Sequence, residues 1–340
     1  LSGGIANKVA FWTSATTLSA TSSFHWDNIN GRLGIGTASP NNKIQVANLI
    51  NFNNSNSGTF LGYSAGAVTT GSWNTFVGYN AGFSNTFGQY NLAMGYGALY
   101  SKAGGFANSA VGYEALYGNT TGDGNSAMGD LALSDNTTGD ENTAMGETAL
   151  GTNTTGYRNT AVGYRAGVII ATGNSNTFLG VEAGYSVSQK IDAVNSMALG
   201  NGAYTNADNQ IRIGNTAITW IGGQVGWQTY SDSRGKYDVN DYNHGLDLVL
   251  KLRPVEFKLK DDATKKMHSG FIAQEVDAIG VPFYGIHRPE TDKDSYSLSY
   301  EEFVVPLVKS VQEQQATIEE LKTENDLLKA RVEQLEAKLK

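Results

Sequence analysis

The sequence contains no cysteine, so disulfide bonds and thiolate metal sites are excluded, and packing and chain association must supply the stability. It has no apolar run close to the roughly 20 residues that a membrane-spanning helix needs. Its 24 basic residues are outnumbered by 32 acidic ones, and no basic face is evident. We therefore predict no membrane insertion, no nucleic-acid partner, no metal site and no cofactor.

Glycine and charge divide the chain into two parts. The first 230 residues hold 36 of the 41 glycines but only 19 of the 56 charged side chains, and the last 110 residues hold the other 37. The chain begins Leu-Ser-Gly-Gly, without Met or a signal-like region, which suits a piece of a longer protein. The composition predicts two differently built parts that meet near residue 230.

A repeat of 17 residues runs through the glycine-rich part. Asn recurs at this interval, Gly follows each Asn by four places, and Ala follows each Gly by three. A small-then-apolar pair, such as Ala93-Met94, stands between Asn and Gly, while Gly58 to Gly62 and Met197 to Gly200 fit as altered first and last copies. The repeated asparagines are Asn74, Asn91, Asn108, Asn125, Asn142, Asn159 and Asn176, and the glycines are Gly78, Gly95, Gly112, Gly129, Gly146, Gly163 and Gly180.

A period of 17 suits neither heptads nor helical hairpins, but it fits one coil of a β-solenoid or one rung of an intertwined β-fibre. We predict a β-stem at residues 46–200, with eight rungs and a length on the order of 40 Å from the strand spacing of about 4.8 Å. The Asn column either stacks as an internal hydrogen-bonded ladder or supports a tight turn in every rung. The fixed Gly marks close backbone approach or a positive φ angle.

A tyrosine column follows the rung glycines. Its position also holds Asp130 and Glu147, which would not be buried unpaired, so the column is expected to face water. Exposed tyrosines in a row suggest contacts with the sugar rings of a cell-surface glycan, but ordinary strand residues at a rung surface are the favoured interpretation. The candidate glycan contacts are Tyr79, Tyr96, Tyr113 and Tyr164.

Two short segments flank the stem. Residues 1–45 contain the alternating run Arg32-Leu-Gly-Ile-Gly-Thr and predict a β-cap at the N-terminal end. Residues 201–230 predict a β-connector, because residues 209–229 alternate apolar and polar side chains as final strands would.

The last 40 residues, 301–340, predict a coiled-coil helix. An a/d pattern runs through them with a single polar a position, Asn325, and the g and e positions offer Glu324 to Lys329 and Arg331 to Glu336. These features favour parallel, in-register chains, and the slender stem leads us to choose a homotrimer over a dimer. The pattern consists of Ile318, Leu321, Asn325, Leu328, Val332, Leu335 and Leu339.

Residues 231–300 predict a compact α+β unit, with a helix near 244–252 and a strand at 255–259. Its first residues read Ser-Asp-Ser-Arg-Gly-Lys. A serine hydroxyl becomes a nucleophile when a base takes its proton, and a lysine amine serves if burial or positive neighbours keep it neutral. Ser231 could then attack the carbonyl of Tyr230, although a Ser and a Lys five apart are common in loops.

The motif Ser231-Asp232-x-Arg234-x-Lys236, followed by Leu252-x-Pro254, His268-x-Gly270-Phe-Ile-Ala-Gln-Glu-Val276 and a coiled coil, resembles the intramolecular chaperone of phage endosialidases and tail fibres. The resemblance extends over 231–340. It implies a trimerising chaperone that cuts itself off between Tyr230 and Ser231, with Ser231 as nucleophile, Lys236 as general base and His268 as an auxiliary residue. Asp232 and Arg234 would orient the loop, while Gly235 stands where the family often has a larger residue.

The sequence therefore predicts a mainly β protein with a trimeric stem, a small α+β chaperone domain and a parallel coiled coil. The leading function is a phage tail fibre or tail spike segment, located in the virion after synthesis in the host cytoplasm. It would attach to a host glycan or protein receptor, contact other virion tail proteins, and have no catalytic activity besides a single self-cleavage. A bacterial trimeric surface adhesin and a glycan depolymerase are the alternatives, and the latter would need two carboxylates about 5 to 10 Å apart.

Overall fold

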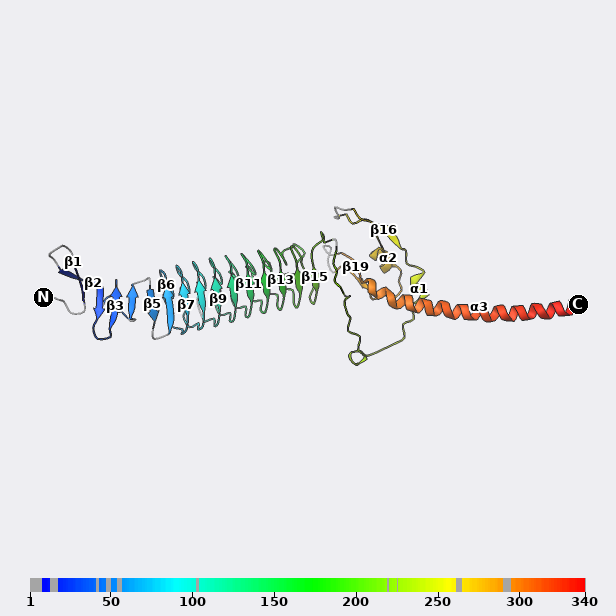
Figure 1. Cartoon of the computed structure of the whole chain (residues 1–340), viewed down its shortest axis with the longest axis horizontal. Coiled ribbons are helices and arrows are strands. Elements are labelled where there is room, and N and C mark those ends of the chain that lie inside the picture. The colour runs from blue at the N-terminus through cyan, green and yellow to red at the C-terminus, as the bar shows by residue number, and fades with distance from the viewer. Residues whose placement is uncertain are drawn as a thin grey trace. The chain divides into compact units, whose positions relative to one another are not determined.

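The computed structural model describes residues 8–12, 18–40, 43–46, 50–53, 57–101, 104–218, 220–224, 226–260, 265–289 and 295–339. They belong to two compact units, Leu1–Thr216 and Ala217–Lys340. The first unit is built from strands and turns and the second holds the helices (Figure 1). Parts of the predicted N-terminal cap, residues 1–7, 13–17 and 41–42, lie outside the described residues.

The first unit contains one sheet whose 15 described strands follow one another in chain order. The N-terminal strands pair mostly antiparallel, and from β6 onward every pairing is parallel. The strands are β1 (Lys8–Trp12), β2 (Leu18–Asp27), β3 (Arg32–Ile35), β4 (Ile44–Val46), β5 (Ile50–Asn53), β6 (Gly58–Leu61), β7 (Thr75–Val77), β8 (Leu92–Met94), β9 (Ser109–Val111), β10 (Ser126–Met128), β11 (Thr143–Met145), β12 (Thr160–Val162), β13 (Thr177–Leu179), β14 (Met197–Leu199) and β15 (Ile211–Ile213).

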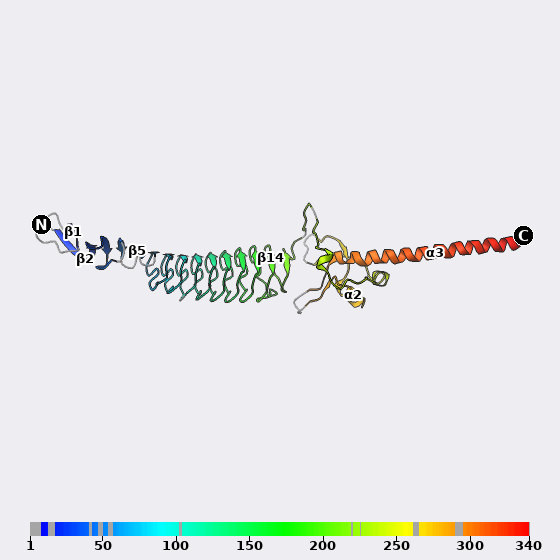
Figure 2. The same cartoon turned by 90° about the horizontal axis from the view of Figure 1, so that it is seen from below.

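Strands β6 to β15 form a β-solenoid in which each coil of the chain lies on the coil before it (Figure 2). The pairing keeps the 17-residue repeat in register, so that Met128 of β10 lies opposite Met145 of β11. This decides between the two predicted architectures, because neighbouring rungs belong to the same chain. The altered copies at Gly58 and Met197 are confirmed as β6 and β14, so the parallel ladder has ten described strands where the repeat predicted eight rungs.

Both predicted roles of the asparagine column are present. Asn125 accepts a bond from the backbone N–H of Asn142 at 3.0 Å through its Oδ1, and donates from Nδ2 to the Gly139 carbonyl in the turn at 2.8 Å. The same pattern recurs from Asn74 to Asn176, and these side chains are buried. The column is therefore an internal ladder that also holds a turn in each rung.

The glycine column closes the strands. Gly112 has a φ of +140°, and a Cβ there would lie 2.4 Å from the carbonyl oxygen of Gly129 in the next rung. Only glycine combines this conformation with this close approach, and it ends each strand from β7 to β13 after three residues.

The solenoid interior is filled in two ways. The central strand position holds Ala in β8 to β12 and Phe in β6, β7 and β13. Six residues later the position holds Leu in the rungs of β8 to β11, but Gly in the rungs that carry Phe. The ring of Phe76 occupies that space, since a Cβ on Gly82 would lie 2.5 Å from it. Each rung thus encloses an apolar core made within one chain.

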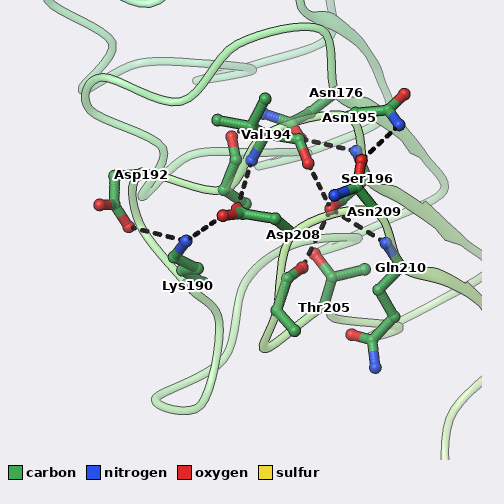
Figure 3. Close-up of polar contacts among 12 residues, drawn as sticks. Asn176, Lys190, Asp192, Val194, Asn195, Ser196, Thr205, Asp208, Asn209 and Gln210 are labelled. Carbon is green, nitrogen blue, oxygen red and sulfur yellow. Dashed lines mark hydrogen bonds and ion pairs between the residues drawn. The ribbon is translucent and has the colours of Figure 1, made fainter.

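The repeat breaks at the C-terminal end of the solenoid. Asn176 bonds to the backbone N–H of Ser196, 20 residues on, and Ser196 donates from its hydroxyl to Ala207 (Figure 3). Asp208 accepts from Lys190 at 2.6 Å and from the Val194 N–H, and the bond from Lys190 holds the pKa of Asp208 below its ordinary value. This polar network caps the last rungs, as terminal repeats of solenoids must.

The predicted final strands at 209–229 are only partly confirmed, because β15 is the last strand in the described part of this segment. The second unit has short elements before a long helix: η1 (Ser233–Gly235), α1 (Leu246–Val249), β16 (Val255–Phe257), β17 (His268–Gly270), α2 (Ala273–Ala278), β18 (Ile286–His287), β19 (Ser297–Leu298), η2 (Tyr300–Phe303) and α3 (Val304–Leu339). The expected helix near 244–252 and strand at 255–259 are present in shorter form.

Hydrogen bonds and ring contacts join the small elements to η2 and to α3. The backbone N–H of Leu246 in α1 donates to Glu313 of α3 at 2.8 Å. Phe303 lies 5.0 Å from Phe271 and 4.3 Å from Phe283, measured between ring centroids. Because α1 is bonded to α3 and the aromatic group packs on Phe303 of η2, the residue directly before α3, the start of the long helix is anchored in the small domain.

The rest of α3 exposes its apolar side chains. Ile318, Leu321 and Leu328 are 45%, 57% and 63% exposed in the single chain. The heptad register also extends upstream of Ile318, because Val304, Leu307 and Val311 fall on its a and d positions and are exposed, although the d position at Gln314 is polar. We call this row of a and d residues, from Val304 to Leu339, the α3 stripe.

Candidate functional site

The loop at residues 231–236 is shaped by a single turn of 3-10 helix. Asp232 is the N-cap of η1 and accepts the backbone N–H of Arg234 at 2.8 Å. The Arg234 guanidinium also bonds to the Asp232 carboxylate, and this bond holds the pKa of Asp232 below its ordinary value. The two predicted supporting residues therefore pair with each other and stabilise the turn.

The turn brings Lys236 back to Ser231. The backbone N–H of Lys236 bonds to the Ser233 carbonyl at 3.1 Å, and its Nζ lies 2.7 Å from the Ser231 Oγ. This is the distance at which a base can take a hydroxyl proton. Both residues are exposed in the single chain.

Tyr230 and Gly235 contact each other across the loop. A Cβ on Gly235 would lie 2.9 Å from Cε1 of Tyr230, so the tyrosine ring rests against the glycine. Tyr230 as a whole is 76% exposed. The contact places the residue before the predicted scissile bond directly against the loop that carries the nucleophile and the amine.

His268 lies on another element. It is the first residue of β17, opposite Phe257 of β16, and its ring is 5.9 Å from the Phe257 ring. The next residues of its motif pack at the base of α3, where Tyr300 accepts the backbone N–H of Phe271 at 3.0 Å. An auxiliary role of His268 in chemistry at Ser231 stays a prediction.

The candidate glycan contacts lie on the solenoid. Tyr79, Tyr96 and Tyr113 are 46%, 49% and 47% exposed, and neighbouring rings stack with centroids 5.2 and 5.3 Å apart. Tyr164 is exposed as well, close to the guanidinium of Arg165. The tyrosine column therefore faces water as expected, but Tyr96 has a ring on both of its faces and presents only its edge and hydroxyl.

Two features of these sites escaped the sequence reasoning. Tyr63 stacks on Tyr79 at 5.4 Å and begins the tyrosine column. Its signal was available, because Tyr63 follows Gly62 as Tyr79 follows Gly78, once a spacing of 16 is allowed. The contact between Tyr230 and Gly235 had no comparable signal, since it depends on the path of the loop.

The described residues contain neither a candidate metal site nor a candidate membrane-spanning helix. Within them, no three His, Asp or Glu side chains gather closely enough to hold an ion. Their helices, including α3, lack the apolar length that crossing a bilayer requires.

Comparison with protein-family models matches residues 231–286 to the family described as chaperone of endosialidase. The match begins at Ser231 itself and covers η1, α1, the strand pair β16–β17 and α2. It ends before α3, so it spans less of the chain than the resemblance over 231–340. Residues 231–286 are thus similar to an endosialidase chaperone domain, and they follow a β-solenoid in the chain, an arrangement that fits a tail-spike-like protein. Comparisons with curated proteins and with solved structures gave no match.

Proposed function

We propose that this chain is a segment of a trimeric phage tail fibre or tail spike, assembled by its C-terminal domain, which then cuts itself off between Tyr230 and Ser231. The observation that carries the proposal is the 2.7 Å contact of Lys236 with Ser231, located where the chaperone-of-endosialidase match begins. The solenoid supplies the stiff body that such a fibre needs.

The cleavage chemistry uses only residues of the loop. The Lys236 amine takes the hydroxyl proton of Ser231, and the Ser231 Oγ attacks the carbonyl carbon of Tyr230. The C–N bond between the two residues breaks, the nitrogen of Ser231 leaves with the proton from Lys236, and an ester joins Tyr230 to the Ser231 oxygen. Water then hydrolyses the ester, which leaves a carboxylate on Tyr230 and restores the Ser231 hydroxyl.

The exposure of the loop gives assembly a role in this reaction. An amine accepts a proton only when it is neutral, and water favours its charged form, whereas burial favours the neutral form. Ser231 and Lys236 are exposed in the single chain. We infer that neighbouring copies cover the loop in the trimer, so that cleavage follows assembly.

The α3 stripe supports the trimer. Seven of its residues, from Ile318 to Leu339, form an unbroken a/d pattern whose apolar members are exposed in one chain. A parallel coiled coil would bury them and would hold identical rungs of the solenoids at the same height. Asn325 at an a position would fix that alignment.

Host attachment is assigned to the solenoid, with other virion tail proteins as further partners. The stacked tyrosines favour a receptor that contacts phenol edges and hydroxyls along the column, for example a glycan lying lengthwise. A sugar could reach the face of a ring only outside these stacks, for example at Tyr164, which stacks on no other ring in the described residues.

Expression of the wild type beside Ser231→Ala tests the cleavage. The wild type is expected to yield fragments of about 230 and 110 residues on a denaturing gel, because Ser231 supplies the attacking oxygen. Ser231→Ala should give one intact chain. Identical intact bands from both proteins would exclude self-cleavage at this site.

A further inference from the structure

An apolar column runs along the outer face of the solenoid sheet. The last residue of each strand from β6 to β15 is Leu, Val, Met or Ile, and the parallel pairing places these residues in one row. Met128 and Met145 are 52% and 42% exposed, and the others are exposed or half-buried. This outer apolar column consists of Leu61, Val77, Met94, Val111, Met128, Met145, Val162, Leu179, Leu199 and Ile213.

The sheet face around the column carries no charge. Strands β6 to β14 contain no Asp, Glu, Lys or Arg in the described structure, and beside the column runs a row that is Thr or Ser in most rungs. The charged residues of these rungs, such as Glu114, Asp130 and Arg158, lie in the turns. A long apolar row that excludes charge is unusual for a surface that stays in water.

Two properties of the chain identify what covers this face. The column recurs at the same height in every copy, and the α3 stripe predicts parallel copies in register, so the same rung of each copy would meet its counterparts. The column is also one residue wide, which suits three equal surfaces that converge on a common axis better than a broad partner protein. The charged turns would remain on the outside.

We propose that the outer apolar column is the trimer interface of the stem, where three copies pack their sheet faces around a common axis. This rests on the proposed trimer and deepens it, because it assigns which side of the solenoid faces inward. The tyrosine column, which follows the strands past the glycine turn, then lies outside the three-fold core and stays open to a receptor.

The absence of native cysteine allows a direct test with the full-length protein. In Met128→Cys the thiols of the three copies would lie near the axis, so a short bis-maleimide is expected to link two chains on a denaturing gel. A bulky maleimide–polyethylene glycol should label this cysteine only after unfolding in urea. Met145→Cys, one rung away, should behave in the same way.

Thr138→Cys is the matched control, since Thr138 is an exposed residue in the turn between β10 and β11. It is expected to be labelled in the native protein and to give no linked pair. Light scattering on the same samples measures the mass of the assembly, so it tests whether a trimer forms, whereas the labelling tests which face of the solenoid lies inside it. A trimeric mass with a freely labelled Met128→Cys would overturn the assignment of this face, whereas a monomeric mass would overturn the trimer itself.

Discussion

At the scale of single residues, the rungs show two solutions to the same packing problem. An Ala in the strand is combined with a Leu six places later, as in Ala93 and Leu99, whereas Phe76 is combined with Gly82. Gly82 and Leu99 share a left-handed backbone, with φ values of 58° and 52°. The backbone therefore accepts either residue, and the volume of the strand side chain decides which one fits in these rungs. The rung of β12 differs, because Ala161 is followed by Gly167, and Phe178 of the next rung lies against that glycine.

We expect a double substitution to exchange one rung type for the other. Phe76→Ala alone leaves a cavity and should cost about 3–5 kcal/mol of unfolding free energy. Gly82→Leu alone overpacks the rung and should cost about 1–3 kcal/mol. The double variant should be more stable than Phe76→Ala, as measured by urea unfolding. Strictly additive losses would contradict the paired packing.

The contact between Tyr230 and Gly235 gives a second prediction at this scale. Gly235→Ala would displace the Tyr230 ring and with it the scissile carbonyl, and should slow cleavage by on the order of tenfold to a hundredfold. Gly235→Ala combined with Tyr230→Ala should recover much of the rate, because the displaced ring is gone. The time course of fragment formation on denaturing gels measures both.

Gly226→Ala is the control for this pair, since a Cβ at Gly226 would meet no atom within 4 Å. It should cleave like the wild type. Equal rates for Gly226→Ala and Gly235→Ala would remove the positioning role of the contact.

At the scale of elements, α3 is a helix whose apolar row has no partner in the single chain. A 36-residue helix with such a row is stabilised mainly by packing against other helices. Two adjacent leucines allow the apolar row to be compared with the rest of the helix surface. Leu328 belongs to the α3 stripe and Leu327 lies beside it at a c position, and they are 63% and 68% exposed.

Leu328→Glu is expected to place a charge in the core of the coiled coil and to abolish the trimer. Cleavage should fall with it, since the loop would stay exposed to water. Leu327→Glu makes the same change outside the α3 stripe and should leave both properties intact. Light scattering and gel analysis of the two variants are the measurements, and equal loss in both would argue against a coiled coil.

At the scale of the whole molecule, the single-chain core changes the argument for a trimer. The slender stem had suggested chains wrapped around one another, but Ala110, Ala127 and Ala144 are fully or almost fully buried within one chain. Filling the rungs therefore needs no second copy. The α3 stripe, the similarity to the endosialidase chaperone and the uncharged sheet face are the features that favour a trimer.

A chain that ends at Tyr230 tests the chaperone. We expect it to remain monomeric or to aggregate, because nothing would align the three solenoids while the outer apolar column is exposed. The same fragment released from the intact protein by cleavage should be trimeric. Sedimentation of the two samples makes the comparison, and soluble trimers from the truncated chain would refute a chaperone role for residues 231–340.

The sequence by itself determined the repeat with its Asn and Gly columns, the exposed tyrosines and the loop that holds Ser231 and Lys236. These follow from local rules, because identical spacing demands identical environments and a five-residue separation bends readily into one turn. Only the tertiary structure decided that successive rungs belong to one chain, that Tyr230 rests on Gly235, and that the Met of each Ala-Met pair points outward. These features depend on which face of the sheet a side chain occupies and on its neighbours in space. A shift of one residue would turn every side chain of a strand to the other face and would leave the 17-residue spacing of the repeat unchanged.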